Sequence, residues 1–136
     1  MKTKTTHIQF NVNKVNLQFY KDLMTTLDWA TIHANDDMLG VGDSNGVSLW
    51  FVAGAKDVAN DYDGPGMNHF SFGTSTQAEV DEVGKQLVAR GVNMLFETPR
   101  HRPDFAMSAE ETYYQIMFES PDRILWEVVY TGPKSA

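Results

Sequence analysis

The chain of 136 residues contains no cysteine, which excludes disulfides, thiolate-bound metals and cysteine nucleophiles. It has no apolar run long enough to cross a membrane, and its start, MKTKTTHIQF, lacks the apolar core of a signal peptide. We therefore expect a cytoplasmic protein with no membrane partner.

Positive charge is also scarce, because the chain has 11 lysines and arginines and 18 aspartates and glutamates. The net charge of −7 disfavours binding to phosphate backbones, so no nucleic-acid partner is expected.

The remaining composition is that of a globular protein. Hydrophobic residues make up 42% of the chain and charged residues 21%. A chain of this length can bury one core, so we expect a single domain over residues 1–136.

Two passages of the sequence show the same order of elements, which indicates an internal repeat. Alternating and helically spaced apolar residues predict a strand, a helix and three strands in each passage. In the first passage these are residues 6–12, 15–27, 29–34, 38–41 and 47–52. In the second they are residues 68–72, 77–90, 92–97, 112–119 and 124–130, with Ser75 or Thr76 as the helix N-cap.

The repeat divides the domain into module one, about residues 5–54, a polar linker, 55–66, and module two, about residues 67–131. Aligning the two modules pairs His7 with His69 and Phe51 with Glu127. The interval between these paired positions is 44 residues in module one and 58 in module two, and we assign the extra length to a loop at residues 98–111. A loop this long within a small domain is often functional.

Glu127 is an unusual residue for its surroundings. It lies within the run ILWEVVY, residues 124–130, which predicts a strand that is apolar on both faces except at this carboxylate. Burying a lone carboxylate costs several kcal/mol unless it is paired, protonated or bound to a metal. Glu127 therefore either reaches water near a strand end or has a specific partner.

A histidine opening each module and a glutamate in the last strand resemble the vicinal oxygen chelate superfamily, which includes glyoxalase I, extradiol dioxygenases, and bleomycin and fosfomycin resistance proteins. Two further segments are similar to family motifs, FYKDL at residues 19–23 and FESPD at 118–122. The resemblance implies an α+β fold. Two βαβββ modules would pair into a curved mixed β-sheet cup with the helices outside.

The resemblance also implies a metal site. The family's ligand positions fall on His7, Phe51, His69 and Glu127, and Phe51 cannot bind a metal. The implied ligands are therefore His7, His69 and Glu127, holding Fe²⁺, Mn²⁺, Zn²⁺ or Ni²⁺. Two imidazoles and one carboxylate leave coordination positions open for a substrate. Simpler interpretations are an exposed His7 and a core His69 bonded to a backbone carbonyl.

Other residues are weaker candidates for the site. Tyr113 and Gln115 share a strand face beside Glu127, so we expect them to line the cup. Arg100, His101 and Arg102 in the long loop could meet an anionic group, or His101 could transfer protons, although a solvated loop would show the same pattern. We assign catalysis to Glu127, His101 and Tyr113, and substrate binding to Phe51, Arg100 and Gln115.

Two functions from different classes follow from the resemblance. The first is a metal-dependent enzyme that chelates a small oxygenated substrate and performs dioxygenase, lyase or isomerase chemistry. The alternative is a metal-free protein of the bleomycin resistance type that holds a cationic drug with acidic groups and the tryptophans Trp29, Trp50 and Trp126. A family member without activity is a third possibility. In each case we expect a homodimer.

Overall fold

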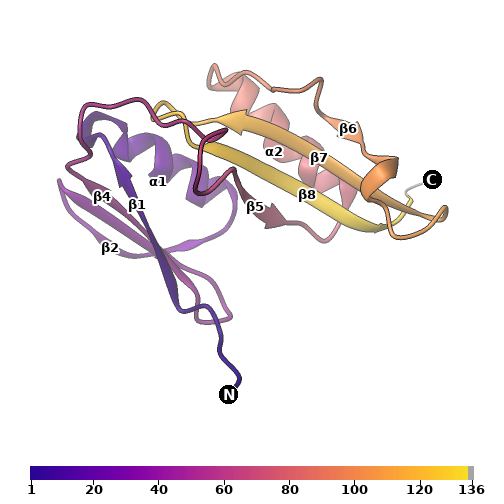
Figure 1. The fold of residues 1–136 in the computed structure, drawn as a ribbon, viewed down its shortest axis with the longest axis horizontal. Helices are drawn as coiled ribbons and strands as arrows, with labels where there is room; N and C mark the ends of the chain where they lie inside the picture. The colour runs from indigo at the N-terminus through magenta and orange to yellow at the C-terminus, as the bar shows by residue number, and fades with distance from the viewer. Residues whose placement is uncertain (135–136) are drawn as a thin grey trace. The chain divides into compact units, whose positions relative to one another are not determined.

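The computed structural model describes residues 1–134, and its chain divides into two compact units, Met1–Ala59 and Asn60–Ala136. The boundary between the units lies within residues 55–66, the segment that the sequence indicates as a linker. Each unit is described by itself below. In each unit an α-helix lies along a β-sheet (Figure 1).

The first unit contains a four-stranded sheet and the helix α1 (Leu17–Thr26), which is preceded by the 3₁₀ helix η1 (Lys14–Asn16). The strand order in the sheet is β1-β4-β3-β2. β1 and β4 are parallel, and the other neighbours are antiparallel. The strands are β1 (His7–Val12), β2 (Ala30–Ala34), β3 (Met38–Gly42) and β4 (Ser48–Ala53).

The second unit repeats this topology with the helix α2 (Gln77–Ala89) and the 3₁₀ helix η2 (Pro103–Phe105). Its strand order is β5-β8-β7-β6, and β5 and β8 are the parallel pair. The predicted α+β fold with two βαβββ modules is therefore confirmed. The strands are β5 (Phe70–Gly73), β6 (Arg100–His101), β7 (Glu111–Glu119) and β8 (Leu125–Pro133).

Each helix packs one apolar side onto its own sheet. α1 buries Tyr20, Leu23 and Met24, and α2 buries Val80, Val83, Gly84 and Leu87. Thr76 caps α2 as predicted: its hydroxyl accepts from the Glu79 N–H at 3.2 Å, and the Glu79 carboxylate accepts from the Thr76 N–H at 3.0 Å. Among the described residues, no helix has the length and apolarity required to cross a membrane.

Residues 92–97 do not form the strand expected from their apolar pattern. Phe96 and Glu97 have φ angles of 57° and 60°, which belong to the left-handed region and are incompatible with an extended strand. The segment still touches β7, because the Leu95 N–H donates to the Met117 carbonyl at 2.8 Å. The second strand of this unit is instead β6, within the segment 98–111 that was expected to be a loop.

Candidate functional site

Glu127 is the third residue of β8 and lies on the face of the sheet that points away from α2. Two contacts identify the helix-facing side of β7: the Tyr114 hydroxyl donates to Asp81 of α2 at 2.6 Å, and Ile116 lies against Gly84 of α2. Met117 therefore points to the opposite, open face, and it is the cross-strand partner of Glu127. Glu127 is only 2% exposed, which excludes the interpretation that its carboxylate reaches water at a strand end.

Two neutral donors on β7 hold the buried carboxylate. The Tyr113 hydroxyl lies 2.9 Å from both Oε1 and Oε2 of Glu127, and the Gln115 side-chain amide donates to Oε2. Both residues were predicted to lie beside Glu127. Burial, the hydrogen bond to the Glu127 carboxylate and the negative charge of that carboxylate together raise the pKa of Tyr113 to about 12, against an opposite effect of the Arg102 charge. Tyr113 therefore keeps its proton at neutral pH.

A second layer of polar contacts fixes Gln115. The Arg102 Nη1 donates to Gln115 Oε1 at 3.3 Å, which leaves the amide nitrogen of Gln115 facing Glu127. Asp104 in turn accepts from Arg102 Nε at 3.3 Å and from Nη2 at 3.1 Å. The planar guanidinium thus connects two side chains at fixed angles, as its geometry favours.

His69 completes the cluster just before β5. Its Nδ1 lies 2.6 Å from Asn68 Oδ1, and the Asn68 amide is oriented because its nitrogen donates to the Tyr62 carbonyl at 3.0 Å. A hydrogen must therefore be on Nδ1, and in the tautomer that has only this hydrogen the lone pair is on Nε2. That nitrogen lies 3.8 Å from Glu127 Oε1, too far for a hydrogen bond.

The donor set of this pair suits a first-row divalent ion. Two atoms that each bind one ion at about 2.0–2.2 Å are at most about 4.4 Å apart, and the 3.8 Å separation of His69 Nε2 and Glu127 Oε1 satisfies this limit. Metal-binding histidines usually donate their other ring N–H to an oxygen, as His69 does to Asn68. Within either unit, residues 1–134 contain no group of three or more metal-binding side chains, so the second unit supplies a pair.

His7, the third predicted ligand, lies in the first unit. It is exposed at the start of β1, and its Nδ1 is 3.1 Å from the Thr6 hydroxyl. Its participation in the metal site stays a prediction.

A pocket of about 760 Å³ opens over Glu127 and His69. Its volume falls within the range of small-molecule sites. The carboxylates of Asp63, Asp104 and Glu127 contribute to it, as do several apolar side chains. The residues lining it are Tyr62, Asp63, Asn68, His69, Phe96, Arg102, Asp104, Phe105, Ala106, Met107, Tyr113, Met117, Leu125 and Glu127.

In the segment Arg100-His101-Arg102, Arg102 rather than His101 contributes to the site around Glu127. His101 pairs with Tyr114 across β6 and β7, its ring centroid is 4.7 Å from that of Tyr114, and its Nδ1 contacts the Thr112 hydroxyl. Because Tyr114 faces α2, His101 lies on the side of the sheet opposite Glu127, and the prediction that it serves this site as acid or base is wrong. Arg102 enters the site instead, whereas Arg100 pairs with the exposed Glu97 at 3.8 Å.

The predicted pairing of Phe51 with Glu127 is off by one residue. Phe51 is fully buried in the first unit, where its ring stacks on Tyr20 of α1 at 4.6 Å. It therefore faces its helix and is not available for substrate binding. Trp50 has the open-face position that corresponds to Glu127, and its ring lies over Gly40 of β3, where a Cβ atom would be 2.5 Å away. Neither residue can bind a metal, so the predicted absence of a fourth ligand does not depend on this correction.

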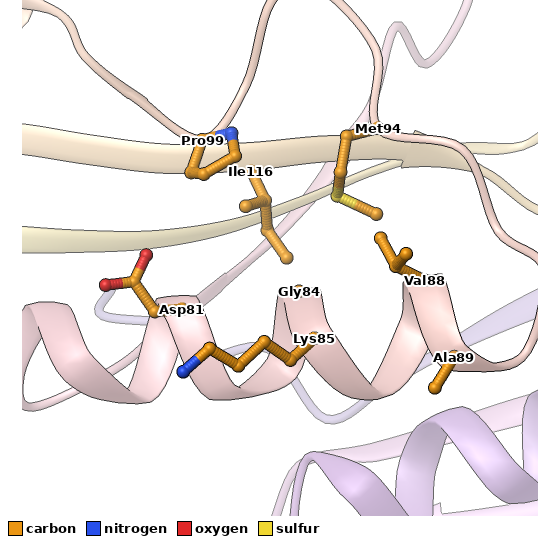
Figure 2. Close-up of a pocket in the computed structure, with 8 residues that line it drawn as sticks. All are labelled: Asp81, Gly84, Lys85, Val88, Ala89, Met94, Pro99 and Ile116. Carbon is orange, nitrogen blue, oxygen red and sulfur yellow. The ribbon is translucent and has the colours of Figure 1, made fainter.

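A second pocket, of about 430 Å³, lies on the other side of the sheet between α2 and β7 (Figure 2). Figure 2 shows mainly apolar side chains around it, and Gly84 leaves part of the space open. Asp81 and Lys85 are the charged residues along it. It is separated from Glu127 by the sheet, so it is not part of the site described above.

Residues 5–128 match the family model of the Glyoxalase/Bleomycin resistance protein/Dioxygenase superfamily. The chain belongs to this superfamily. A candidate glyoxalase from Bacillus halodurans has a similar fold, with a TM-score of 0.76 and 23% identity over 93% of this chain and 94% of that one. FosX, a fosfomycin resistance protein from Listeria monocytogenes complexed with Mn(II) and sulfate, gives a TM-score of 0.69 and 22% identity over 96% of this chain and 91% of that one.

A sequence relative is the protein YqjT of Bacillus subtilis. It is 34% identical over 64 residues, which are 47% of this chain and 46% of YqjT. The match therefore spans about half the length of this curated relative. Membership of the superfamily rests on the family model, which covers nearly all of the chain.

Proposed function

We propose that this superfamily member is a metal-dependent enzyme acting on a small oxygenated molecule by dioxygenase, lyase or isomerase chemistry. The observation that carries the proposal is that Nε2 of His69 faces the buried Glu127 carboxylate at 3.8 Å with no hydrogen bond between them. Two lone pairs opposed in this way are stabilised by a cation. Fe²⁺, Mn²⁺, Zn²⁺ or Ni²⁺ suits an imidazole and a carboxylate, and His7 is the third proposed ligand.

The residues around the pair support this assignment. When bound, a divalent ion supplies Lewis-acid stabilisation of an oxyanion on a chelated substrate. Gln115 holds Oε2 of Glu127, which leaves Oε1 as the carboxylate atom nearest His69. Tyr113 stays protonated and donates to the same carboxylate, so Glu127 is fixed before any ligand arrives. FosX, a superfamily protein with the same fold, binds Mn(II), which agrees with the proposed class of metal.

The test is elemental analysis of protein purified without a histidine tag and reconstituted with each of the four metals. We expect about one divalent ion per chain in the wild type, and its loss in both Glu127→Ala and His69→Ala. His101→Ala, which alters a histidine on the opposite face of the sheet, serves as the control and should keep the metal. His7→Ala tests the third ligand separately. A wild type that binds no metal after reconstitution would contradict the proposal.

One observation favours a second candidate, a metal-free binding protein of the bleomycin resistance type. The carboxylates of Asp63, Asp104 and Glu127 line the same pocket as the aromatic rings of Phe105 and Tyr113, a combination that suits a cationic aromatic drug. The predicted use of Trp126 in such a protein is wrong, because this residue is fully buried among Phe70 and Phe72. The metal analysis separates the two candidates.

We also propose that the protein is a homodimer, as the family resemblance implies. Light scattering at several protein concentrations measures the mass directly. A mass of one chain at every concentration would contradict this proposal.

A further inference from the structure

We infer that the substrate of this site has an aromatic or aliphatic arm, and that Phe96, Phe105 and Met107 form the subsite that binds it. The inference rests on the proposed function, because it names the class of molecule that the Glu127 pocket accepts. The molecule would carry its oxygenated group toward Glu127 and His69 and its apolar arm toward these three residues, which we call the apolar rim.

The apolar rim consists of large hydrophobic side chains that remain exposed in the folded chain. Phe96 is 52% exposed, Phe105 53% and Met107 88%, and all three line the same pocket as Glu127. Isolated exposed hydrophobic residues are common on protein surfaces, but a group of them around one concave site marks a binding surface. Their continuity with the polar floor of the pocket indicates a small molecule that contacts both.

The local structure holds Phe105 in a position to bind a ligand. Its ring covers the Arg102 guanidinium, with 4.5 Å between the centroid and Cζ, and packs edge-on against Tyr113 at 5.5 Å. One part of the ring is therefore fixed against the site, and about half of the residue is left open. Met107 follows on the same segment, and its unbranched thioether side chain adapts to ligands of different shape.

The size of the pocket supports the same class of substrate. Its volume of about 760 Å³ is suited to a molecule of drug size. A single-residue variant of FosX from Listeria monocytogenes has been crystallised with a three-carbon phosphonate, 1S,2S-dihydroxypropylphosphonic acid, which has no extended apolar arm. The apolar rim of this chain therefore points to a substrate that differs from that ligand by a substantial hydrophobic group.

The first experiment compares two chelating probes that differ only in the apolar group, acetohydroxamate and benzohydroxamate. Their dissociation constants from the Mn(II)-loaded protein are measured by calorimetry. We expect benzohydroxamate to bind at least about ten-fold more tightly, and the Phe105→Ser/Met107→Ser double variant to lose most of this ratio. Val88→Ser replaces a residue that is 56% exposed on α2, on the other side of the sheet, and should keep the ratio.

The second experiment needs no metal, so it separates failure of this inference from failure of the proposed function. Methyl groups of the seven methionines are labelled with ¹³C in the metal-free protein. Benzohydroxamate should shift the signals of Met107 and Met117, which line the pocket, and leave that of Met94, which lines the pocket on the other side of the sheet, unchanged.

Three results would overturn the inference. The first is equal affinity for the two probes in the loaded protein, and the second is a ratio that survives in the double variant. The third is a Met107 signal that benzohydroxamate does not shift but that changes with protein concentration. The apolar rim would then bind a second copy of this chain. A wild type without metal, but with the expected Met107 and Met117 shifts, would overturn the proposed function and support the apolar subsite.

Discussion

The Tyr113 hydroxyl oxygen lies 2.9 Å from both oxygens of the Glu127 carboxylate, so one phenol serves both acceptors of a buried acid. Gln115 adds a second donor from the same face of β7. The sequence places these residues two positions apart on one strand, which is the spacing that puts them on the same face.

Tyr113→Phe should lower the free energy of unfolding of the metal-free protein by about 1–3 kcal/mol, because a buried carboxylate loses a donor. Urea denaturation at neutral pH measures the change. Tyr130→Phe is the matched control, because its hydroxyl donates at 2.8 Å to the exposed Pro133 carbonyl. Its effect should stay within about 0.5 kcal/mol. Equal losses in the two variants would show that Tyr113 does not stabilise Glu127.

The contact between Arg102 and Asp104 should contribute to metal affinity through Gln115. We expect the charge-balanced variant Arg102→Met/Asp104→Asn to weaken Mn(II) binding by about 10–100-fold, the usual effect of losing residues that orient a ligand. Electron paramagnetic resonance of free Mn(II) gives the dissociation constant. Arg100→Met/Glu97→Gln removes a similar pair at 3.8 Å outside the pocket and should leave the affinity unchanged. Weaker binding in both variants would point to a general charge effect.

Ionisation of Tyr114 should lower the free energy of unfolding at alkaline pH. Burial, the hydrogen bond to Asp81 and the negative charge of Asp81 together raise the pKa of Tyr114 to about 12. An unfolded tyrosine ionises near pH 10, so between about pH 10 and 12 the unfolded chain releases a proton that the folded chain keeps. The stability from Tyr114 is therefore complete below pH 10 and is lost as the pH rises through 12.

Comparison with Tyr114→Phe isolates this effect from that of the other tyrosines. Urea denaturation of both proteins between pH 8 and 11 should give the wild type the larger free energy of unfolding at pH 8. The difference between the two proteins should decrease above pH 10. A constant difference across this range would contradict the assignment.

Gly84→Ala should stabilise the second unit by about 0.5–1 kcal/mol, because alanine favours the helix over glycine. The new Cβ would lie 3.5 Å from Ile116 Cγ2, an ordinary contact, and Figure 2 shows open space beside it. The melting temperature should rise, and Mn(II) affinity should not change because Glu127 is on the other face. A lower melting temperature would indicate that the pocket cannot accept a methyl group.

Gly40→Ala, in contrast, should destabilise the first unit. Its Cβ would lie 2.5 Å from Trp50 Cζ3, well inside the distance at which atoms repel each other. The indole is anchored by a 3.0 Å hydrogen bond from its N–H to the Ser48 hydroxyl, so it cannot move away without losing that bond. We expect a loss of about 1–3 kcal/mol in the free energy of unfolding. A double variant with Trp50→Val should recover part of it.

The sequence was sufficient to predict the repeat, both helices and most strands, because their apolar patterns and the Thr76 cap are local signals. It was insufficient for the segment 92–97, since the positive φ angles of Phe96 and Glu97 occur in residues that give no sign of a left-handed backbone. The short strand β6 has two residues, too few to produce a recognisable pattern.

The errors at the site have a common physical origin, which is the choice between two faces of a strand. The run Leu49-Trp50-Phe51-Val52 is apolar at every position, so its pattern does not tell which side chains face the helix, and Phe51 was exchanged with Trp50. Likewise, the pairing of His101 with Tyr114 places His101 on the face of the sheet that packs on α2, and its neighbour Arg102 on the open face. Glu127 was identified because it is the one charged residue in an apolar strand.

The alternation of faces along β7 has a consequence for evolution. Tyr113, Gln115 and Met117 belong to the open face, while Tyr114, Ile116 and Phe118 pack on the helix side. Mutations at odd-numbered positions can therefore change the side chains around Glu127 without disturbing the helix interface, and mutations at even-numbered positions can change stability without altering the surroundings of Glu127. A superfamily whose members range from glyoxalases to dioxygenases and drug resistance proteins could diversify in this way, one residue at a time, on an unchanged core.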